Sequence, residues 1–226
     1  MDSEHRQLVE RLQDKKMSGD GNLHYVEGLL GGNRVILTQC GIGKVNAAVG
    51  ATELIRRFAP DCVISTGVAG GIDTCLRVTD VVVSERLVYH DVWCGNEYEY
   101  GQMAEMPAVY EGCVSLLEHA LSLNGTGLES YIHSGLICTG DQFITNRTEL
   151  DAIKQRFPDG LAVDMESVAI AQTCYLYNTP FLSFRIISDT PWVDDHASQY
   201  ADFWGTMAER SFLTIWTFLS TLPSNL

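Results

Sequence analysis

The chain has 226 residues, a hydrophobic fraction of 46% and a formal net charge of −14. This length suits one domain over residues 1–226, with a core large enough to need no disulfide staples. The negative charge excludes nucleic acid and anionic membrane surfaces as partners, because the phosphates of both would repel it.

The cysteines and the apolar runs indicate the compartment. There are seven cysteines, no two are spaced as Cys-x-x-Cys, and several lie in apolar runs such as Cys62–Ile64. This pattern favours buried free thiols in a reducing compartment, and without ligand spacing we expect neither a metal nor a cofactor. The polar start predicts no signal peptide, and no apolar run reaches the roughly 18 residues of a membrane span. We therefore expect a cytoplasmic protein.

Hydrophobic periodicity predicts alternating strands and helices along the first half of the chain. A first helix places Leu8 and Leu12 on one face, and a turn cluster follows at 18–22. Strands at 23–30 and 34–39 form a hairpin. A helix at 45–58 then leads to a strand at 62–66 that runs into a glycine-rich segment.

The second half continues the alternation after an interruption. A strand at 81–84 is followed by an irregular, aromatic-rich stretch at 87–110, of a length that is usually functional. The remaining expected elements are a helix at 113–123, a strand at 133–140, a helix at 148–157, a strand at 161–163, a helix from about 164 to 177, a strand at 181–187 and a final helix at 200–222. The sum predicts a three-layer α/β fold whose mixed central sheet, largely parallel at its centre, is flanked by helices.

Ligands in such folds bind beyond the carboxyl ends of the strands, which singles out three places. The first is Gly67–Gly71, whose backbone can approach a ligand closely, although a simple turn explains it nearly as well. The other two are 164–166 and 188–189. A further glycine turn, Gly41–Lys44, lacks the spacing of a phosphate loop and is expected to join a strand to a helix without a catalytic role.

Two acidic residues at strand ends are the candidate catalytic groups. Glu166 lies between a buried strand and a helix, where the helix dipole favours the ionised form, and its carboxylate can accept hydrogen bonds from a ribose diol. Asp164 has an equally good explanation as a helix cap. Asp189 follows a buried strand, so that desolvation is expected to raise its pKa and make it a proton donor. Arg185 on the same strand needs a partner, and Glu4 and Asp164 are the candidates.

Six stretches carry a resemblance to a known family. They are 40–48, 65–71, 98–102, 140–144, 163–166 and 185–189, in order over nearly the whole chain. With them the sequence resembles the bacterial 5′-methylthioadenosine/S-adenosylhomocysteine nucleosidases of the purine nucleoside phosphorylase superfamily. The resemblance implies hydrolysis of an N-glycosidic bond without a cofactor, and an adenine nucleoside as substrate.

The resemblance also implies roles for individual residues. Asp189 would protonate N7 of adenine, Glu166 and Met165 would hold the ribose, and Glu4 would position the attacking water, with Arg185 nearby. The base would lie against Phe143 and Ile144. Further expected pocket residues are Val68, Ala69, Gly70, Val163, Asp164, Ser188 and Tyr200. In a homodimer, the loop from Trp93 to Pro107 would cap the partner's alkylthio pocket.

The sequence departs from the family at three points. An apolar first strand usually precedes the Met-x-x-Glu segment, and here Met1 is that methionine, so we expect this strand to be missing, Glu4 to be loosely held and activity to be weak. Val68 replaces a common serine, and Asp164 replaces a common glutamate. Three alternatives therefore stay open: a nucleoside phosphorylase, a hydrolase of futalosine-type nucleosides, and a non-catalytic nucleoside-binding protein.

Overall fold

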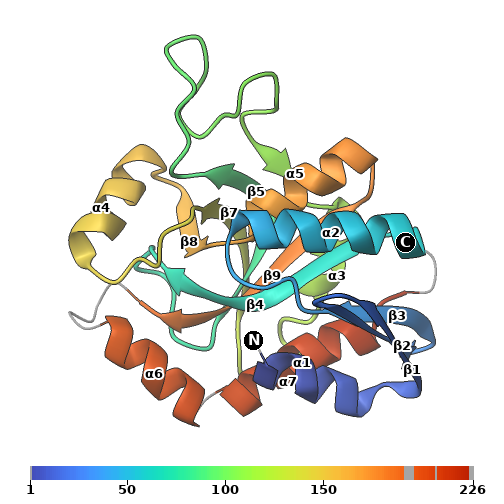
Figure 1. The fold of residues 1–226 in the computed structure, drawn as a ribbon. Coiled ribbons are helices and arrows are strands. Elements are labelled where there is room, and N and C mark those ends of the chain that lie inside the picture. Colours follow the sequence, from blue (N-terminus) through green and yellow to red (C-terminus); the bar gives the residue numbers. More distant parts are fainter. Residues whose placement is uncertain (1, 191–195, 207, 224–226) are drawn as a thin grey trace.

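The computed structural model describes residues 2–190, 196–206 and 208–223, and shows a mixed sheet with helices on both faces (Figure 1). Six strands form this central sheet in the order β6-β5-β7-β8-β4-β9. They are β4 (Val63–Gly71), β5 (Val81–Tyr89), β6 (Tyr110–Glu111), β7 (Ile132–Thr139), β8 (Gly160–Asp164) and β9 (Phe181–Asp189). The predicted fold class is confirmed.

Most of the pairing within the central sheet is parallel. β5 with β7, β7 with β8, and β4 with β9 are parallel, whereas β4 meets β8 antiparallel at only two residue pairs. The first residues of β5 also pair antiparallel with β9, so the sheet closes on itself. All nine residues of β9 are buried, although four of them, Ser183, Arg185, Ser188 and Asp189, are polar or charged and therefore need partners inside the protein.

A second, antiparallel sheet packs beside the first with the order β1-β2-β3. Its strands are β1 (Gln13–Asp20), β2 (Leu23–Leu30) and β3 (Asn33–Thr38). The predicted hairpin is confirmed, with Leu30 opposite Asn33. The turn predicted at 18–22 is wrong in part, because β1 continues to Asp20 and only Gly21 and Asn22 form the turn. Polar residues dominate β1, so period-two hydrophobicity gave no signal there.

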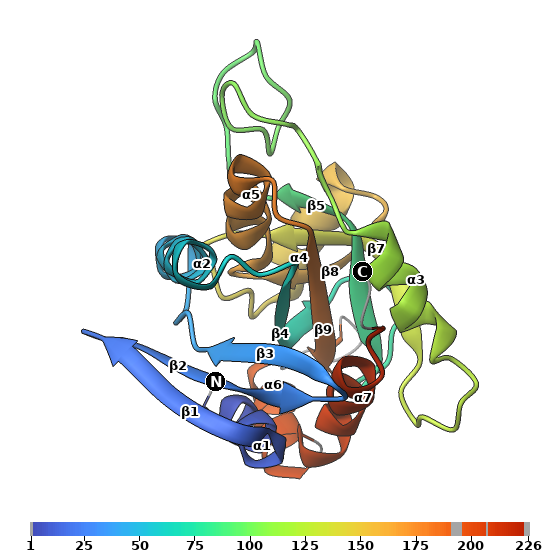
Figure 2. The same ribbon diagram turned by 90° about the vertical axis from the view of Figure 1, so that its right-hand side faces the viewer.

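Seven helices complete the described part of the chain. They are α1 (Asp2–Arg11), α2 (Lys44–Phe58), α3 (Val114–Ser122), α4 (Arg147–Arg156), α5 (Ser167–Tyr177), α6 (His196–Thr206) and α7 (Ala208–Ser220). Helices α2 and α5 lie side by side on one face, whereas α1, α6 and α7 lie with the small sheet on the opposite side (Figures 1 and 2). The helix predicted at 200–222 is confirmed over the described residues 200–206 and 208–220, and α6 begins earlier, at His196.

The first half of β4 and the outer strand of the small sheet each have one unpaired edge. Within the described residues, β3 pairs only with β2, and β4 pairs only with β9 from Val63 to Ala69. Side chains of both strands that face this region, including Leu37 and Ile64, are only partly buried. No helix among the described residues is long and apolar enough to cross a membrane.

Candidate active site

A large cavity opens at the ends of the central strands and extends to the small sheet. Its volume is about 1420 Å³, above the roughly 300–1,000 Å³ of ordinary ligand pockets. One end is polar and is lined by Glu166, Arg185 and Asp189. The other end is apolar and lies between β3 and β4, where Leu37, Ile64 and others line it. The cavity is thus larger than one small ligand requires.

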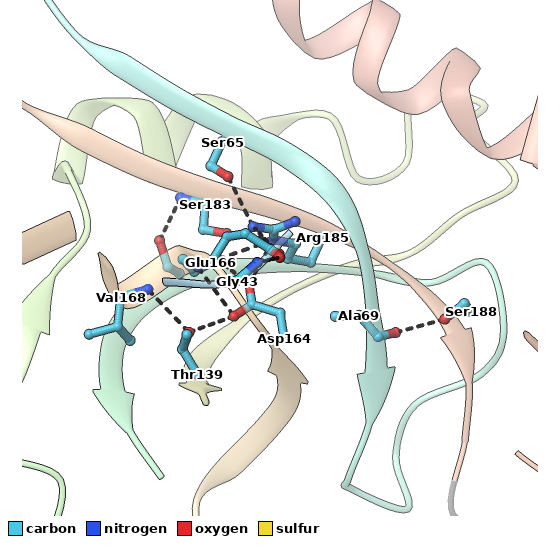
Figure 3. A network of polar contacts seen from close by, with 12 residues as sticks. Gly43, Ser65, Ala69, Thr139, Asp164, Glu166, Val168, Ser183, Arg185 and Ser188 are labelled. Atoms are coloured by element: carbon cyan, nitrogen blue, oxygen red, sulfur yellow. Dashed lines mark hydrogen bonds and ion pairs between the residues drawn. The ribbon is translucent and has the colours of Figure 1, made fainter. Parts of the chain in front are cut away.

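Glu166 stands at the polar end and is held from an unexpected direction. It is the residue before α5, but its side chain makes no cap to that helix. Its Oε1 instead accepts a hydrogen bond of 2.9 Å from the backbone N–H of Gly43, at the N-terminus of α2 (Figure 3). Helix α2 has no side-chain cap of its own, so this carboxylate satisfies one of its free N–H groups. The glycine turn to which the sequence assigned no role therefore contacts the site.

Some groups around Glu166 raise the pKa of its carboxyl and others lower it. Burial is the largest influence and raises the pKa of this carboxyl, and the nearby Asp164 raises it further. Arg185 and the N–H of Gly43 lower the pKa, but the net shift is upward. The expectation that the helix terminus would dominate is therefore wrong, because a side chain that is 15% exposed loses most of its hydration.

Arg185 and Asp164 form a buried ion pair under Glu166. Nε of Arg185 lies 2.9 Å from Oδ2 of Asp164, and both side chains are almost fully buried. Nη2 of Arg185 donates to Ser65 at 3.0 Å and lies 3.9 Å from Oε2 of Glu166. Of the two partners considered for Arg185, Asp164 is the observed one. A buried charge without such a partner would cost several kcal/mol.

The carboxylate of Asp164 is engaged by the protein itself. It accepts hydrogen bonds from the hydroxyls of Thr139 and Ser167 and from the backbone N–H of Ser167. With Arg185 this gives four donors, which is about the number of lone pairs a carboxylate offers. Asp164 lines the cavity as predicted for a pocket residue, but its carboxylate already has these protein partners. The alternative that Asp164 caps a helix agrees with its bond to the N–H of Ser167.

Asp189 lies at the end of β9 and lines the same cavity as Glu166. The hydroxyl of Ser188 donates to Oδ1 of Asp189 at 2.7 Å and also reaches the carbonyl of Ala69 at 3.3 Å. Gly70 faces this carboxyl, and a Cβ there would lie 3.2 Å from Oδ2 of Asp189. The segment Gly67–Gly71 is thus the last part of strand β4 rather than a turn, and its glycines let side chains of β9 and β8 approach.

Aromatic and apolar side chains surround the space next to Asp189. The rings of Phe143 and Tyr200 meet edge to face with their centroids 5.4 Å apart. Phe143 is 56% exposed, so one face of its ring is available for stacking. The remaining predicted pocket residues that line the cavity are Val68, Ala69, Gly70, Ile144, Val163 and Met165. Glu4 belongs to α1, but its side chain lies outside the described residues.

Sequence reasoning missed the hydroxyls that organise this site. Thr139, Ser167, Ser183 and Ser65 bind Asp164 or Arg185, and Ser167 also contacts Ser183 at 2.6 Å. Each stands in or next to an apolar run, where a hydroxyl alone predicts nothing. Hydroxyls in otherwise buried strands that converge on one charged residue are the signal that was available.

A mixed sheet with carboxylates at or next to the strand ends, beside an aromatic pair, is the arrangement of the phosphorylase superfamily of α/β proteins. The family model described as "Phosphorylase superfamily" matches residues 1–220. Among characterised sequences, the 5′-methylthioadenosine/S-adenosylhomocysteine nucleosidase of Chromohalobacter salexigens is 43% identical over 191 residues, or 84% of this chain and 81% of that protein. That of Maridesulfovibrio salexigens is 38% identical over 95% of this chain and 94% of its own.

Solved structures agree with these sequences. The nucleosidase of Neisseria meningitidis in complex with methylthio-immucillin-A has a TM-score of 0.91 and 36% identity, covering 98% of this chain and 96% of that one. The S-adenosylhomocysteine nucleosidase of Streptococcus pyogenes, bound to 5-methylthiotubericidin, has a TM-score of 0.92 and 35% identity, covering 99% and 94%. The chain belongs to the 5′-methylthioadenosine/S-adenosylhomocysteine nucleosidase family within the phosphorylase superfamily.

Proposed function

We propose that the protein hydrolyses the N-glycosidic bond of 5′-methylthioadenosine and S-adenosylhomocysteine, releasing adenine and the corresponding 5-thioribose. The observation that carries the proposal is that Glu166, just after β8, and Asp189, at the end of β9, line one cavity together with the aromatic pair Phe143 and Tyr200. Each of the two carboxyls has its own hydrogen-bonding environment. Different environments allow one carboxyl to stay ionised while the other gives a proton.

Departure of the base needs a proton donor and a stabiliser of positive charge. Asp189 protonates N7 of adenine, which turns an anionic leaving group into a neutral one. As the bond breaks, the sugar carbon becomes cationic, and the fixed negative charge of Glu166 stabilises it while its carboxylate binds a ribose hydroxyl. Water attacks the sugar carbon, its oxygen becomes the new hydroxyl, and its proton passes to a base, for which Glu4 is the candidate. Phe143 stacks on the adenine ring.

Adenine release from methylthioadenosine tests this function. We expect purified protein to release adenine and free methylthioribose at the same rate with and without inorganic phosphate. A requirement for phosphate, with a sugar phosphate as product, would instead show a phosphorylase. Faster release from aminofutalosine would move the substrate to the futalosine type, and nucleoside binding without any release would indicate a sensor.

We infer that two copies of the chain associate through α2, α5 and the loop between β5 and β6. This loop, which contains the segment from Trp93 to Pro107, projects beyond the body of the protein next to α2 and α5 (Figures 1 and 2). Large apolar side chains are exposed there, among them Val45 at 75%, Leu176 at 61% and Trp93 at 55%. Exposed apolar patches of this kind mark protein interfaces. Light scattering should give twice the mass of one chain, and Leu176→Asp should reduce it to a single chain.

The cysteines of the chain bear on the compartment in which the protein works. All seven cysteines are free thiols, and Cys138 and Cys174 are buried. Free thiols in this number are typical of a reducing compartment, so we propose the cytoplasm.

We propose further that the apolar end of the cavity is the place of the first strand expected for this family. The support is that β3 and β4 both offer an unpaired edge there, and one extended segment can use both edges since it has backbone groups on two sides. Half-buried side chains on both strands would be covered by such a segment. His5 and Leu8 of α1 line the same cavity, so a segment joined to the start of this helix reaches it.

An extended variant tests this proposal. Adding six alternating apolar residues in front of Met1 should raise both the midpoint of thermal unfolding and the rate of adenine release, because Glu4 follows the added strand directly. Six Gly and Ser residues in the same place are the control and should change neither. Equal behaviour of the two extensions would contradict the proposal.

A further inference from the structure

Among the described residues, the carboxylates of Asp164 and Glu166 both lie near Arg185, and Arg185 binds Asp164 more closely. Its Nε lies 2.9 Å from Asp164, whereas its Nη2 stays 3.9 Å from Glu166, beyond hydrogen-bond distance. Figure 3 shows the side chains of Arg185, Glu166 and Asp164 gathered in one network. The side chains of Arg185 and Glu166 already form a long ion pair, and a movement of about 1 Å would turn it into a direct hydrogen bond. Something therefore restrains Arg185 in its present place.

The restraint comes from groups that face Asp164 and Arg185 on several strands. Thr139 of β7 and Ser167 of α5 fix the carboxylate of Asp164, as described above. The hydroxyls of Ser183 and Ser65 accept from Nε and Nη2 of Arg185 at 3.2 and 3.0 Å. A side chain at position 67 would collide with the guanidinium, since a Cβ there would lie 2.3 Å from Nη1. Glycine at this position leaves room for the observed orientation.

We infer that Asp164 is a positioning residue which, by binding Arg185, keeps the guanidinium from pairing directly with Glu166 and so leaves the Glu166 carboxylate available to the sugar. This inference rests on the proposed function of Glu166 as the ribose ligand. Asp164 itself need not touch the substrate. Asp164 is one methylene shorter than a glutamate, so the side chain at this position sets how far Arg185 is held from Glu166.

The charges around Glu166 decide in which direction the pKa of Glu166 changes when Asp164 is replaced. Among the described residues, Asp164 on β8, Arg185 on β9 and the thiol of Cys40 before α2 face it, together with the N–H of Gly43. Burial raises the pKa of the Cys40 thiol, so the thiol is neutral at neutral pH. Asp164→Asn removes a negative neighbour and releases Arg185 toward Glu166. Both changes favour the ionised form of Glu166.

The experiment compares Asp164→Asn with Thr139→Val, which removes one hydrogen bond to Asp164 but leaves its charge. For Asp164→Asn we expect KM for methylthioadenosine to rise about tenfold to a hundredfold, as for a lost hydrogen bond to a charged group. The change in kcat should be smaller, and the acid limb of kcat/KM should move to lower pH. Thr139→Val should leave this limb in place, and Asp164→Glu should restore KM.

Binding of free adenine separates this effect from damage to the fold, because adenine alone does not reach Glu166. Calorimetry should show unchanged affinity of Asp164→Asn for adenine and weakened affinity for a non-hydrolysable nucleoside analogue. Equal weakening of both, or an unmoved acid limb with an unchanged KM, would overturn the inference. Absence of turnover in the unmodified protein would overturn the proposed function instead, while the two affinities would still decide the role of Asp164.

Discussion

The two ends of the large cavity differ in how many of their polar groups have hydrogen-bond partners and in how deeply their apolar side chains are buried. At the polar end, Asp164, Glu166 and Arg185 have partners from β4, β7, β9 and α2, and little of their surface reaches solvent. At the apolar end, β3 and the part of β4 from Val63 to Ala69 each have one edge that no described strand pairs with, and side chains such as Ile64 are only half-buried. The comparison indicates that the site can be pre-organised by its own network even where the neighbouring packing is incomplete.

The largest expected effect is at the polar end. Asp189→Asn keeps the shape of the side chain and its contact with Ser188 but cannot give up a proton to adenine. We expect kcat for adenine release to fall by about 10²–10⁴, as for the loss of a general acid. The rate is measured by the absorbance change on adenine formation, with nucleoside binding as the control for folding. A fall of less than about tenfold would mean that another group protonates the base.

The pH dependence of kcat/KM reports the ionisation of Glu166. An exposed glutamate has a pKa of about 4.3. Because burial raises the pKa of Glu166, we expect the acid limb of kcat/KM to lie above that value. The sign follows from the role of the ionised form, since activity is lost as pH falls through the raised pKa. Glu166→Gln should lower activity and remove this limb. A limb that persists in Glu166→Gln would belong to another group.

A matched pair of substitutions compares the packing of the two regions directly. Ile186 on β9 is fully buried, whereas Ile64 on β4 faces the apolar end of the cavity, and both belong to the same core. Ile186→Ala should cost about 2–5 kcal/mol in the free energy of unfolding, but Ile64→Ala only about 1 kcal/mol, because less of its surface is removed from water. Denaturant unfolding measures both, and similar costs would contradict the comparison.

The smallest effect is expected at an ion pair away from the cavity. Nζ of Lys154 lies 2.5 Å from Asp73, and both side chains are partly exposed. Burial alone would raise the pKa of Asp73, but Lys154 and the backbone N–H of Cys75 outweigh it and lower the pKa to about 2. The pair therefore stabilises the fold fully at pH values above the pKa of Asp73 in the unfolded chain. This stabilisation is lost as the pH falls toward the lowered pKa of about 2.

Lys154→Met tests this contribution by removing the charge and keeping the apolar stem. We expect a loss of about 0.2–1 kcal/mol at neutral pH, as for other partly exposed pairs. The difference from the unmodified protein should shrink below pH ~4, where Asp73 becomes protonated in the unfolded chain. A loss of several kcal/mol would mean that Lys154 also stabilises the fold through its contact with the carbonyl of Gly160.

The amino-acid sequence by itself determined the order of the strands and helices and the position of Glu166 and Asp189 at strand ends. Those features depend on local patterns, namely periodicity, glycines and prolines, which a reader can follow along the chain. The polar and mostly exposed β1 left no such pattern, and it was missed.

Only the tertiary structure decided which polar groups meet. The contact between Gly43 and Glu166 joins residues 123 positions apart, and the closure of the sheet by β5 and β9 brings together strands that the chain separates widely. Asp164 binds Arg185, and the groups that satisfy its carboxylate come from three different elements, namely Thr139 of β7, Ser167 of α5 and Arg185 of β9. Burial is encoded locally, but the partner of a buried charge is set by the packing of the whole chain.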